Sequence, residues 1–182
     1  MSEPGTAASD RSQAAATVVG GWFERHVQTI HRYAARRVGE HEAWDVVAET
    51  FRVALERFDE YDAHRAHERA WLYGIASNIL HRHARTEARR LRARARAAAA
   101  AGVPGDPLVD SDARLDATCE ADRVATAVAE LAPDDRELLV LVAWECLSSA
   151  EVAEAMGIPA GTVRTRLRRI RAQLRDPRGG DR

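Results

Sequence analysis

Residues 147–175, LSSAEVAEAMGIPAGTVRTRLRRIRAQLR, constrain the fold of this chain more than any other stretch. Ser148 and Glu151 have the spacing of a capping box, which predicts that a helix begins here. Gly157 tolerates the positive φ that a helix C-terminus often requires, and Pro159 cannot continue a helix. The stretch is therefore expected to form two short helices joined by a tight turn, the pattern of a helix-turn-helix.

The second of these helices is amphipathic and strongly basic. Its apolar residues recur at steps of four, three and four, which places them on one face. Arginines repeat along a neighbouring face, and no acidic residue occurs between Thr162 and Arg175. A helix that only faces solvent usually carries charges of both signs, so we favour insertion into the major groove of DNA over a solvated helix face. The apolar residues are Val163, Leu167, Ile170 and Leu174.

The rest of the chain predicts an all-α protein. Hydrophobic residues make up 46% of the 182 residues, but many are alanine, which favours helix, and no sustained alternation of β-branched residues occurs. Helical spacing recurs before and after a proline- and glycine-containing stretch, which predicts two small helical domains joined by a flexible linker. The expected divisions are a disordered leader (1–21), a first domain (22–96), the linker (97–119), a second domain (120–175) and a tail (176–182).

The distribution of charge is more informative than the net charge of −1. Residues 81–96 hold seven arginines and one glutamate, and residues 147–182 hold eight arginines and four acids. Between them, residues 97–137 hold ten acids and three arginines. Two basic blocks separated by an acidic one indicate two surfaces that bind polyanions.

Several classes of protein do not fit this sequence. No apolar run approaches the ~20 residues that span a bilayer, and the N-terminus lacks the features of a secretory signal, so a cytoplasmic protein is expected. Cys119 and Cys146 are too few for a disulfide framework. His64 and His67 match no zinc-protease motif, and no catalytic triad or phosphate-binding glycine loop is present, so we expect no enzyme, no metal and no cofactor.

Three short motifs resemble those of sigma-70 family RNA polymerase sigma factors of the extracytoplasmic-function (ECF) type, which contain regions 2 and 4 only. Residues 45–51, DVVAETF, resemble the family's DLVQETF, and residues 70–78, AWLYGIASN, resemble its AWLxxIARN. Residues 158–166, IPAGTVRTR, resemble its IPxGTVxSR. The resemblance implies a protein that directs core RNA polymerase to promoters and starts transcription. It covers most of 22–96 (region 2) and 120–175 (region 4).

The resemblance also implies roles for particular residues of region 2. The helix that contains DVVAETF is expected to bind core polymerase, although Phe51 is equally well explained as a core residue. The helix that follows Trp71, with the loop before it, is expected to hold the −10 element, where bases unstack and arginines follow phosphates. Trp71 itself falls on the apolar stripe and is expected in the core. Ala48 and Arg82 depart from the family pattern, which leaves −10 specificity open. The implied polymerase contacts are Asp45, Glu49, Phe51 and Arg52, and the implied −10 contacts are Tyr61, His64, Asn78, Arg82, His83 and Arg85.

The second helix of the helix-turn-helix is implied to read the −35 element. Arginine can bind guanine O6 and N7 through two hydrogen bonds, so a −35 sequence that contains guanine is expected. Arg171 and Arg175 lie farther along the helix and are expected to touch phosphate or nothing. The implied −35 contacts are Thr162, Arg164, Thr165, Arg168, Arg169 and Arg171.

Two other functions stay open at this level. One is a stand-alone helix-turn-helix regulator that does not act through polymerase, and the other is a helical adaptor whose arginines bind acidic proteins. The two region 2 motifs favour the sigma factor, whose partners would be core RNA polymerase, promoter DNA and a separate anti-sigma factor. The regulon, the inducing signal and the identity of the inhibitor do not follow from the sequence.

Overall fold

The computed structural model describes residues 4–64, 66–100 and 119–175, and every regular element in these ranges is helical, as predicted. The expected tail and the linker residues 101–118 lie outside these ranges. The elements are α1 (Pro4–Glu56), the 3-10 helix η1 (Phe58–Glu60), α2 (Glu68–Ala100), α3 (Cys119–Glu130), α4 (Pro133–Ala143), α5 (Ser149–Met156) and α6 (Ala160–Arg175).

The N-terminal segment differs from the prediction of a disordered leader. Helix α1 already begins at Pro4, and Ala15, Val19 and Trp22 are buried. These three residues are spaced by four and three, so they lie on one helix face, which packs against the body of the protein. The prediction was wrong because this alanine-rich segment favours a helix, and its narrow apolar stripe has other residues to pack against.

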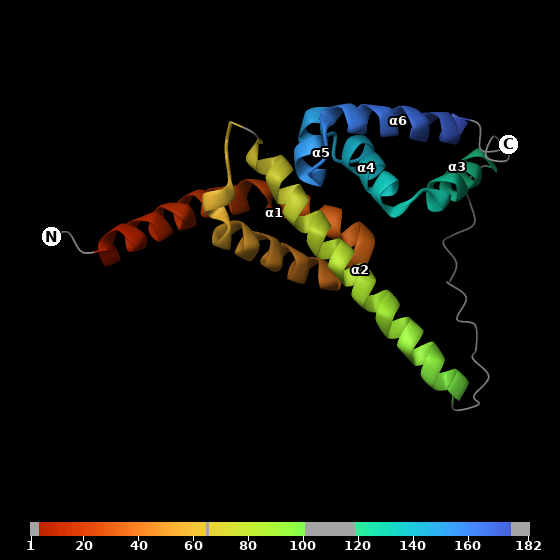
Figure 1. Ribbon diagram of the computed structural model, residues 1–182, viewed down its shortest axis with the longest axis horizontal. Coiled ribbons are helices and arrows are strands. Elements are labelled where there is room, and N and C mark those ends of the chain that lie inside the picture. Colours follow the sequence, from red (N-terminus) through yellow and green to blue (C-terminus); the bar gives the residue numbers. More distant parts are fainter. Residues whose placement is uncertain (1–3, 65, 101–118, 176–182) are drawn as a thin grey trace.

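A single glycine divides α1 into two rods. Gly39 has φ 83° and ψ 165°, outside the helical region, a conformation that glycine adopts readily. After Gly39 the chain turns back beneath the first rod, and α2 runs across both (Figure 1). Ile30, Tyr33 and Leu72 are among the fully buried side chains of the resulting core.

The C-terminal helices form the predicted helix-turn-helix. Ser148 and Glu151 make both hydrogen bonds of the capping box: the Ser148 backbone N–H donates to Glu151 Oε2 at 2.8 Å, and the Glu151 N–H donates to Ser148 Oγ at 3.3 Å. The first of these bonds lowers the pKa of Glu151. Gly157 ends α5 in the left-handed region, at φ 64°, and α6 follows within four residues.

The two halves of the chain pack against each other in this structure and share one continuous hydrophobic cluster. Helix α5 lies against α2 at Gly74, where the two backbones come very close (Figure 1). A Cβ atom added at Gly74 would meet the carbonyl oxygen of Ala155 at 2.7 Å and its Cα at 3.3 Å. Only glycine therefore permits this contact between the N-terminal and C-terminal helices.

Two tryptophans at helix surfaces are exposed. Trp44 is 49% exposed and stacks on the buried His31, with ring centroids 4.2 Å apart. Trp144 is 55% exposed at the end of α4. Their rings lie at helix surfaces that no other described element covers completely.

Replacement of Gly74 by alanine should loosen the packing of α5 on α2. The clash falls on backbone atoms, which cannot rotate away as a side chain can. We expect the radius of gyration of the free chain, measured by small-angle X-ray scattering, to increase, while far-ultraviolet circular dichroism still reports a helical protein.

Gly20→Ala is the matched control, because Gly20 is also helical and a Cβ there meets nothing within 4 Å. It should stabilise its helix by about 1 kcal/mol and leave the scattering unchanged. An unchanged radius of gyration in Gly74→Ala would contradict the close contact described above.

Candidate nucleic-acid interface

Helix α6 presents a continuous basic face to solvent. Val163, Leu167 and Ile170 are buried beneath it, which fixes the rotation of the helix. Four arginines at steps of four, three and four then lie along an exposed neighbouring face, and within the described residues they form no ion pair. This row has the position and chemistry required of a helix that reads a major groove. The four are Arg164, Arg168, Arg171 and Arg175.

Two further predicted −35 residues are engaged within the protein. Arg169 forms an ion pair with Asp135, which is buried in the first turn of α4, and Arg166 lies 3.9 Å from the same carboxylate. Arg169 therefore links α6 to α4 through this ion pair. Thr165 is exposed, but its hydroxyl donates to the carbonyl of Gly161 at 3.0 Å. The remaining predicted residue, Thr162, is partly buried at the start of α6.

The predicted −10 residues fall into two groups. Asn78, Arg82 and Arg85 are exposed and follow one another at steps of four and three, so they share one face of α2. His83 is exposed on another side of the same helix and lines a groove described below.

The loop residues lie apart, near the start of α2. Tyr61 packs within an aromatic cluster, 4.8 Å from Trp22 and 5.2 Å from Trp71 between ring centroids. Its ring is therefore partly covered, which leaves less of it free to stack on a base. His64 is exposed, and its backbone N–H donates to the Asp62 side chain at 2.9 Å. Trp71 is half-buried, consistent with a core role.

The predicted polymerase contacts lie along the second rod of α1. Asp45 and Arg52 are exposed, and Glu49 is partly exposed. Arg52 bonds Glu49 at 2.7 Å and also pairs with Glu56, and its hydrogen bonds lower the pKa of Glu49. Phe51 is only 7% exposed and packs against Phe23, with ring centroids 5.0 Å apart, which fits the alternative of a core residue.

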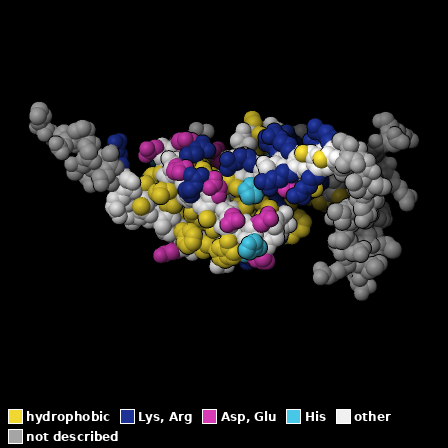
Figure 2. Space-filling model, turned by 90° about the horizontal axis from the view of Figure 1, so that it is seen from below, with side chains coloured by type: hydrophobic (Ala, Val, Ile, Leu, Met, Phe, Trp, Pro, Cys, Tyr) yellow, Lys and Arg dark blue, Asp and Glu magenta, His cyan; other side chains and the backbone are white. Residues whose placement is uncertain are grey.

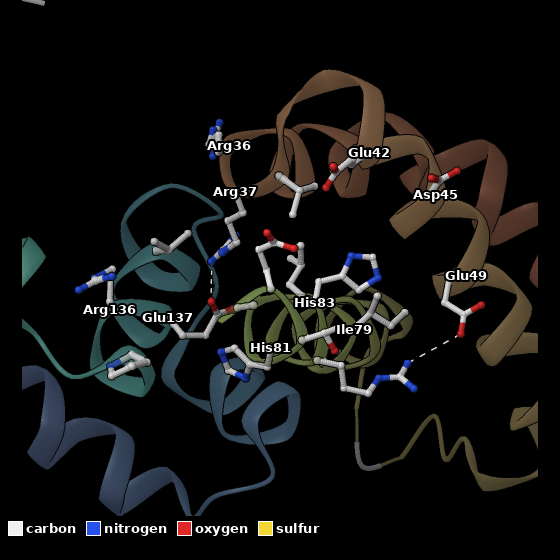
Figure 3. Close-up of a pocket in the computed structure, with 18 of the residues that line it drawn as sticks. Arg36, Arg37, Glu42, Asp45, Glu49, Ile79, His81, His83, Arg136 and Glu137 are labelled. Atoms are coloured by element: carbon white, nitrogen blue, oxygen red, sulfur yellow. Dashed lines mark hydrogen bonds and ion pairs between the residues drawn. The ribbon is translucent and has the colours of Figure 1, made fainter. Parts of the chain in front are cut away.

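A groove of about 1370 Å³ separates this part of α1 from α4 (Figure 3). Asp45 and Glu49 line one wall, and Arg136 and Glu137 line the other, with His81 and His83 of α2 between them. The predicted polymerase-contact carboxylates therefore lie on the wall opposite the C-terminal helices, where Glu49 also pairs with Arg82 of α2 at 3.8 Å.

Glu137 is a buried carboxylate that joins the two halves of the chain. It is 5% exposed, and its oxygens accept hydrogen bonds from Arg37 Nη2 at 2.6 Å, from the Ser77 hydroxyl at 3.1 Å and from the Tyr33 hydroxyl. Burial, with the nearby Glu137 charge, raises the pKa of Tyr33 well above its usual value, so Tyr33 remains a donor. Arg37 also lies over the Tyr33 ring, 4.0 Å from its centroid.

Glu145, just after α4, repeats this arrangement. It is 6% exposed and accepts hydrogen bonds from Arg36 at 2.8 Å and from the Tyr73 hydroxyl. Its backbone carbonyl accepts a hydrogen bond from Arg69. Burial raises the pKa of Tyr73, so that hydroxyl also stays protonated.

Sequence reasoning did not find these two carboxylates. Glu137 lies inside the acidic block and Glu145 beside an exposed tryptophan, positions that are usually solvated. In the sequence, both glutamates fall on otherwise apolar faces of the α4 segment. This position could have indicated buried carboxylates, but only with knowledge of the helices that pack against them.

The described residues hold no group of three or more His, Cys, Asp or Glu side chains arranged to bind a metal ion. Among the described helices, none combines the length and apolarity required to cross a membrane.

The comparison with known proteins agrees with this geometry. The family described as "Sigma-70 region 2" matches residues 22–90, and the family "Sigma-70, region 4" matches residues 121–174. The "Probable RNA polymerase sigma-C factor" of Mycobacterium bovis is 31% identical over 150 residues, which cover 81% of this chain and 76% of that protein. The "ECF RNA polymerase sigma factor SigE" of Mycolicibacterium smegmatis is 32% identical over 179 residues, 94% of this chain and 66% of that protein.

Solved structures resemble the whole fold. The sigma factor RpoE, in complex with the anti-sigma factor NepR from Bartonella quintana, matches with a TM-score of 0.57 and 21% identity, covering 90% of this chain and 98% of that one. CnrH, in complex with the cytosolic domain of CnrY, matches with a TM-score of 0.57 and 25% identity, covering 94% and 96%. Both regions match in order and the curated relatives cover most of the chain. This protein therefore belongs to the sigma-70 family, as an ECF RNA polymerase sigma factor.

Proposed function

We propose that this sigma factor, which directs core RNA polymerase to promoters, reads the −35 element with α6 and the −10 element with α2. The observation that carries the −35 assignment is the row of Arg164, Arg168 and Arg171 on the exposed face of the second helix of a helix-turn-helix. Asn78 supports the −10 assignment, because its amide can both donate to and accept from a base edge. The relatives are sigma factors, which direct an enzyme, and we assign no catalytic step to this chain.

We assign the polymerase contact to the second rod of α1. Asp45 is exposed there, and Glu49 and Arg52 form a charged row beside it. Charged side chains on an exposed helix suit a partner helix of complementary charge. Phe51 supports this surface from beneath.

The packed arrangement places the two reading surfaces too close together to read both promoter elements. Asn78 lies four residues from Gly74, about 6 Å along α2, and Thr162 lies seven residues from Ala155, at most ~25 Å away. Since Gly74 touches Ala155, Asn78 and Thr162 lie within about 35 Å of each other. Elements centred 10 and 35 base pairs upstream of the start site are roughly 85 Å apart on B-form DNA.

We infer that the packed arrangement is the form of the free chain and that regions 2 and 4 separate on the promoter. Separation also frees the α1 wall of the groove, which Asp45 and Glu49 line. The solved relatives are complexes with the anti-sigma factor NepR and with the cytosolic domain of CnrY. We propose that this chain likewise has a separate anti-sigma partner and acts in the cytoplasm.

Transcription in vitro tests the function directly. Core polymerase supplied with this chain should initiate at discrete sites on genomic fragments, whereas core polymerase alone should not. If no fragment yields initiation that depends on this chain, the sigma-factor assignment fails; specific DNA binding by the chain without core polymerase would instead favour a stand-alone regulator.

Arg168→Ala should weaken binding of the holoenzyme to its promoter by about 1–3 kcal/mol if Arg168 reads a base. The loss should disappear on a promoter whose −35 base opposite Arg168 is already changed. An equal loss on every −35 sequence would mean that Arg168 touches only phosphate.

Arg169→Ala is the matched comparison on the same helix. Because Arg169 pairs with the buried Asp135, its removal should lower the melting temperature of the chain more than Arg168→Ala does. Equal melting temperatures for the two variants would contradict a bracing role for Arg169.

A further inference from the structure

The loop before α2 has few hydrogen bonds of its own. Between Tyr61 and His67 no described residue is helical, and the described backbone bonds within the loop reduce to one, from the Ala66 N–H to the Asp62 carbonyl at 3.1 Å. The Asp62 side chain adds a bond from the His64 N–H at 2.9 Å. A loop with so few internal bonds depends on contacts at its two ends for a defined shape.

Trp22 of α1 packs against aromatic rings on both sides of this loop. It is 4% exposed, and its ring centroid lies 5.6 Å from Phe58, 4.8 Å from Tyr61 and 5.8 Å from Trp71. Aromatic pairs at such distances attract each other beyond the area that they bury. Trp22 therefore joins η1, the first residue of the loop and the first turn of α2 at one point.

The same turn of α1 also binds the end of the loop, through Glu68. Glu68 Oε1 lies 3.4 Å from Arg25 Nη2 and 3.4 Å from His26 Nε2. Burial lowers the pKa of His26, and Glu68 opposes this only in part, so the ring is neutral at neutral pH and its Nε2–H can donate to the carboxylate. Burial acts to raise the pKa of Glu68, but the bond with His26 and the neighbouring basic groups lower it overall, so Glu68 is charged.

This side of α1 differs from the side that carries exposed apolar residues. Phe23 is 43% exposed although Trp22 beside it is buried, because adjacent residues of a helix point about 100° apart. Figure 2, a view from below, shows apolar side chains gathered on the face away from the loop, which rises above α1 in Figure 1. The buried stripe of Trp22 continues toward the N-terminus through Val19 and Ala15, at steps of three and four. The segment before residue 22, where the match to region 2 begins, thus lies on the same face as the contacts to the loop.

All of these contacts lie within region 2, so they remain when regions 2 and 4 separate on the promoter. Between the two anchored ends, Asp62, Ala63 and His64 are exposed. A loop whose ends are already held loses less conformational entropy when it receives a ligand. The anchors on α1 therefore bear directly on how well the exposed part of the loop can hold a base.

We propose that the link from Glu68 to Arg25 and His26, supported by Trp22, positions the loop before α2 so that it receives an unstacked base of the −10 element. The proposal rests on the assignment of α2, with this loop, to the −10 element. Glu68 is a positioning residue and does not bind DNA, because its charge would repel a phosphate. Loss of the link should weaken the hold on one base and leave general affinity for DNA intact.

The test compares two variants that each remove one carboxylate beside the loop. Glu68→Ala breaks the link to α1, whereas Glu60→Ala removes an exposed carboxylate that pairs with Arg57, three residues earlier. In reconstituted holoenzyme, affinity is measured for the single-stranded non-template −10 strand of a promoter found by transcription in vitro. It is measured again with the same strand lacking one base at a time, and the ratio of the two affinities reports how strongly that base is held.

For the wild type, removal of the base held by the loop should lower affinity about tenfold, the size expected for one stacked base. In Glu68→Ala this ratio should fall to about twofold, because the loop no longer holds its orientation. Affinity for core polymerase and binding to the −35 duplex should stay unchanged. Glu60→Ala should keep the wild-type ratio.

A second pair of variants separates positioning from folding. His26→Leu removes the donor to Glu68, whereas His26→Gln keeps an N–H group of similar reach. The ratio should fall in His26→Leu and recover in His26→Gln, with the melting temperature of each variant recorded in parallel.

A wild-type ratio in Glu68→Ala or in His26→Leu would overturn the proposal, as would an equal fall in Glu60→Ala. A fall that only accompanies a lower melting temperature, with no recovery in His26→Gln, would also overturn it, because the link would then only stabilise the fold. If the wild-type holoenzyme loses no affinity on removal of any base, the −10 assignment itself fails, which separates the two results.

Discussion

The structure depends on two buried carboxylates. Glu137 and Glu145 come from the C-terminal helices, and each is held by an arginine and a tyrosine hydroxyl from α1 or α2. A buried charge is tolerated only where its partners are complete, so these pairs fix how α4 sits on the N-terminal helices. Removing one partner of such a pair typically costs 3–5 kcal/mol, far more than an exposed ion pair.

This interface explains the arrangement of the functional surfaces. Packing of α5 at Gly74 leaves the arginine face of α6 and the face of α2 that carries Asn78 exposed, but brings them close together. It also places α4 across the groove from Asp45 and Glu49. The DNA-reading side chains of α6 and of α2 are both exposed. They can contact the two elements of one promoter together only after the two halves separate. Parting exposes apolar side chains of the cluster that the two halves share, as well as the two carboxylates.

What the sequence predicts well is local. The capping box of α5, the left-handed Gly157 and the apolar stripe of α6 depend on residues within one or two turns, and all were found as expected. What it misses involves distant partners. Glu137 contacts residues 60 to 104 positions earlier in the chain, so its acidic neighbours in sequence suggested a solvated site. Phe51 and Trp44 share one apolar pattern, yet only Phe51 is covered, because Phe23 lies over it.

The most direct measurement is the distance between regions 2 and 4 before and after promoter binding. With Cys119 and Cys146 replaced by serine, donor and acceptor dyes at Asp59→Cys and Gln173→Cys would report it by energy transfer; both positions are exposed. We predict efficient transfer in the free chain and a large loss of transfer in the complex with core polymerase and promoter, because the reading residues Asn78 and Thr162, within about 35 Å in the free chain, must move to elements roughly 85 Å apart. Equal transfer in the two states, whether high or low, would contradict the account.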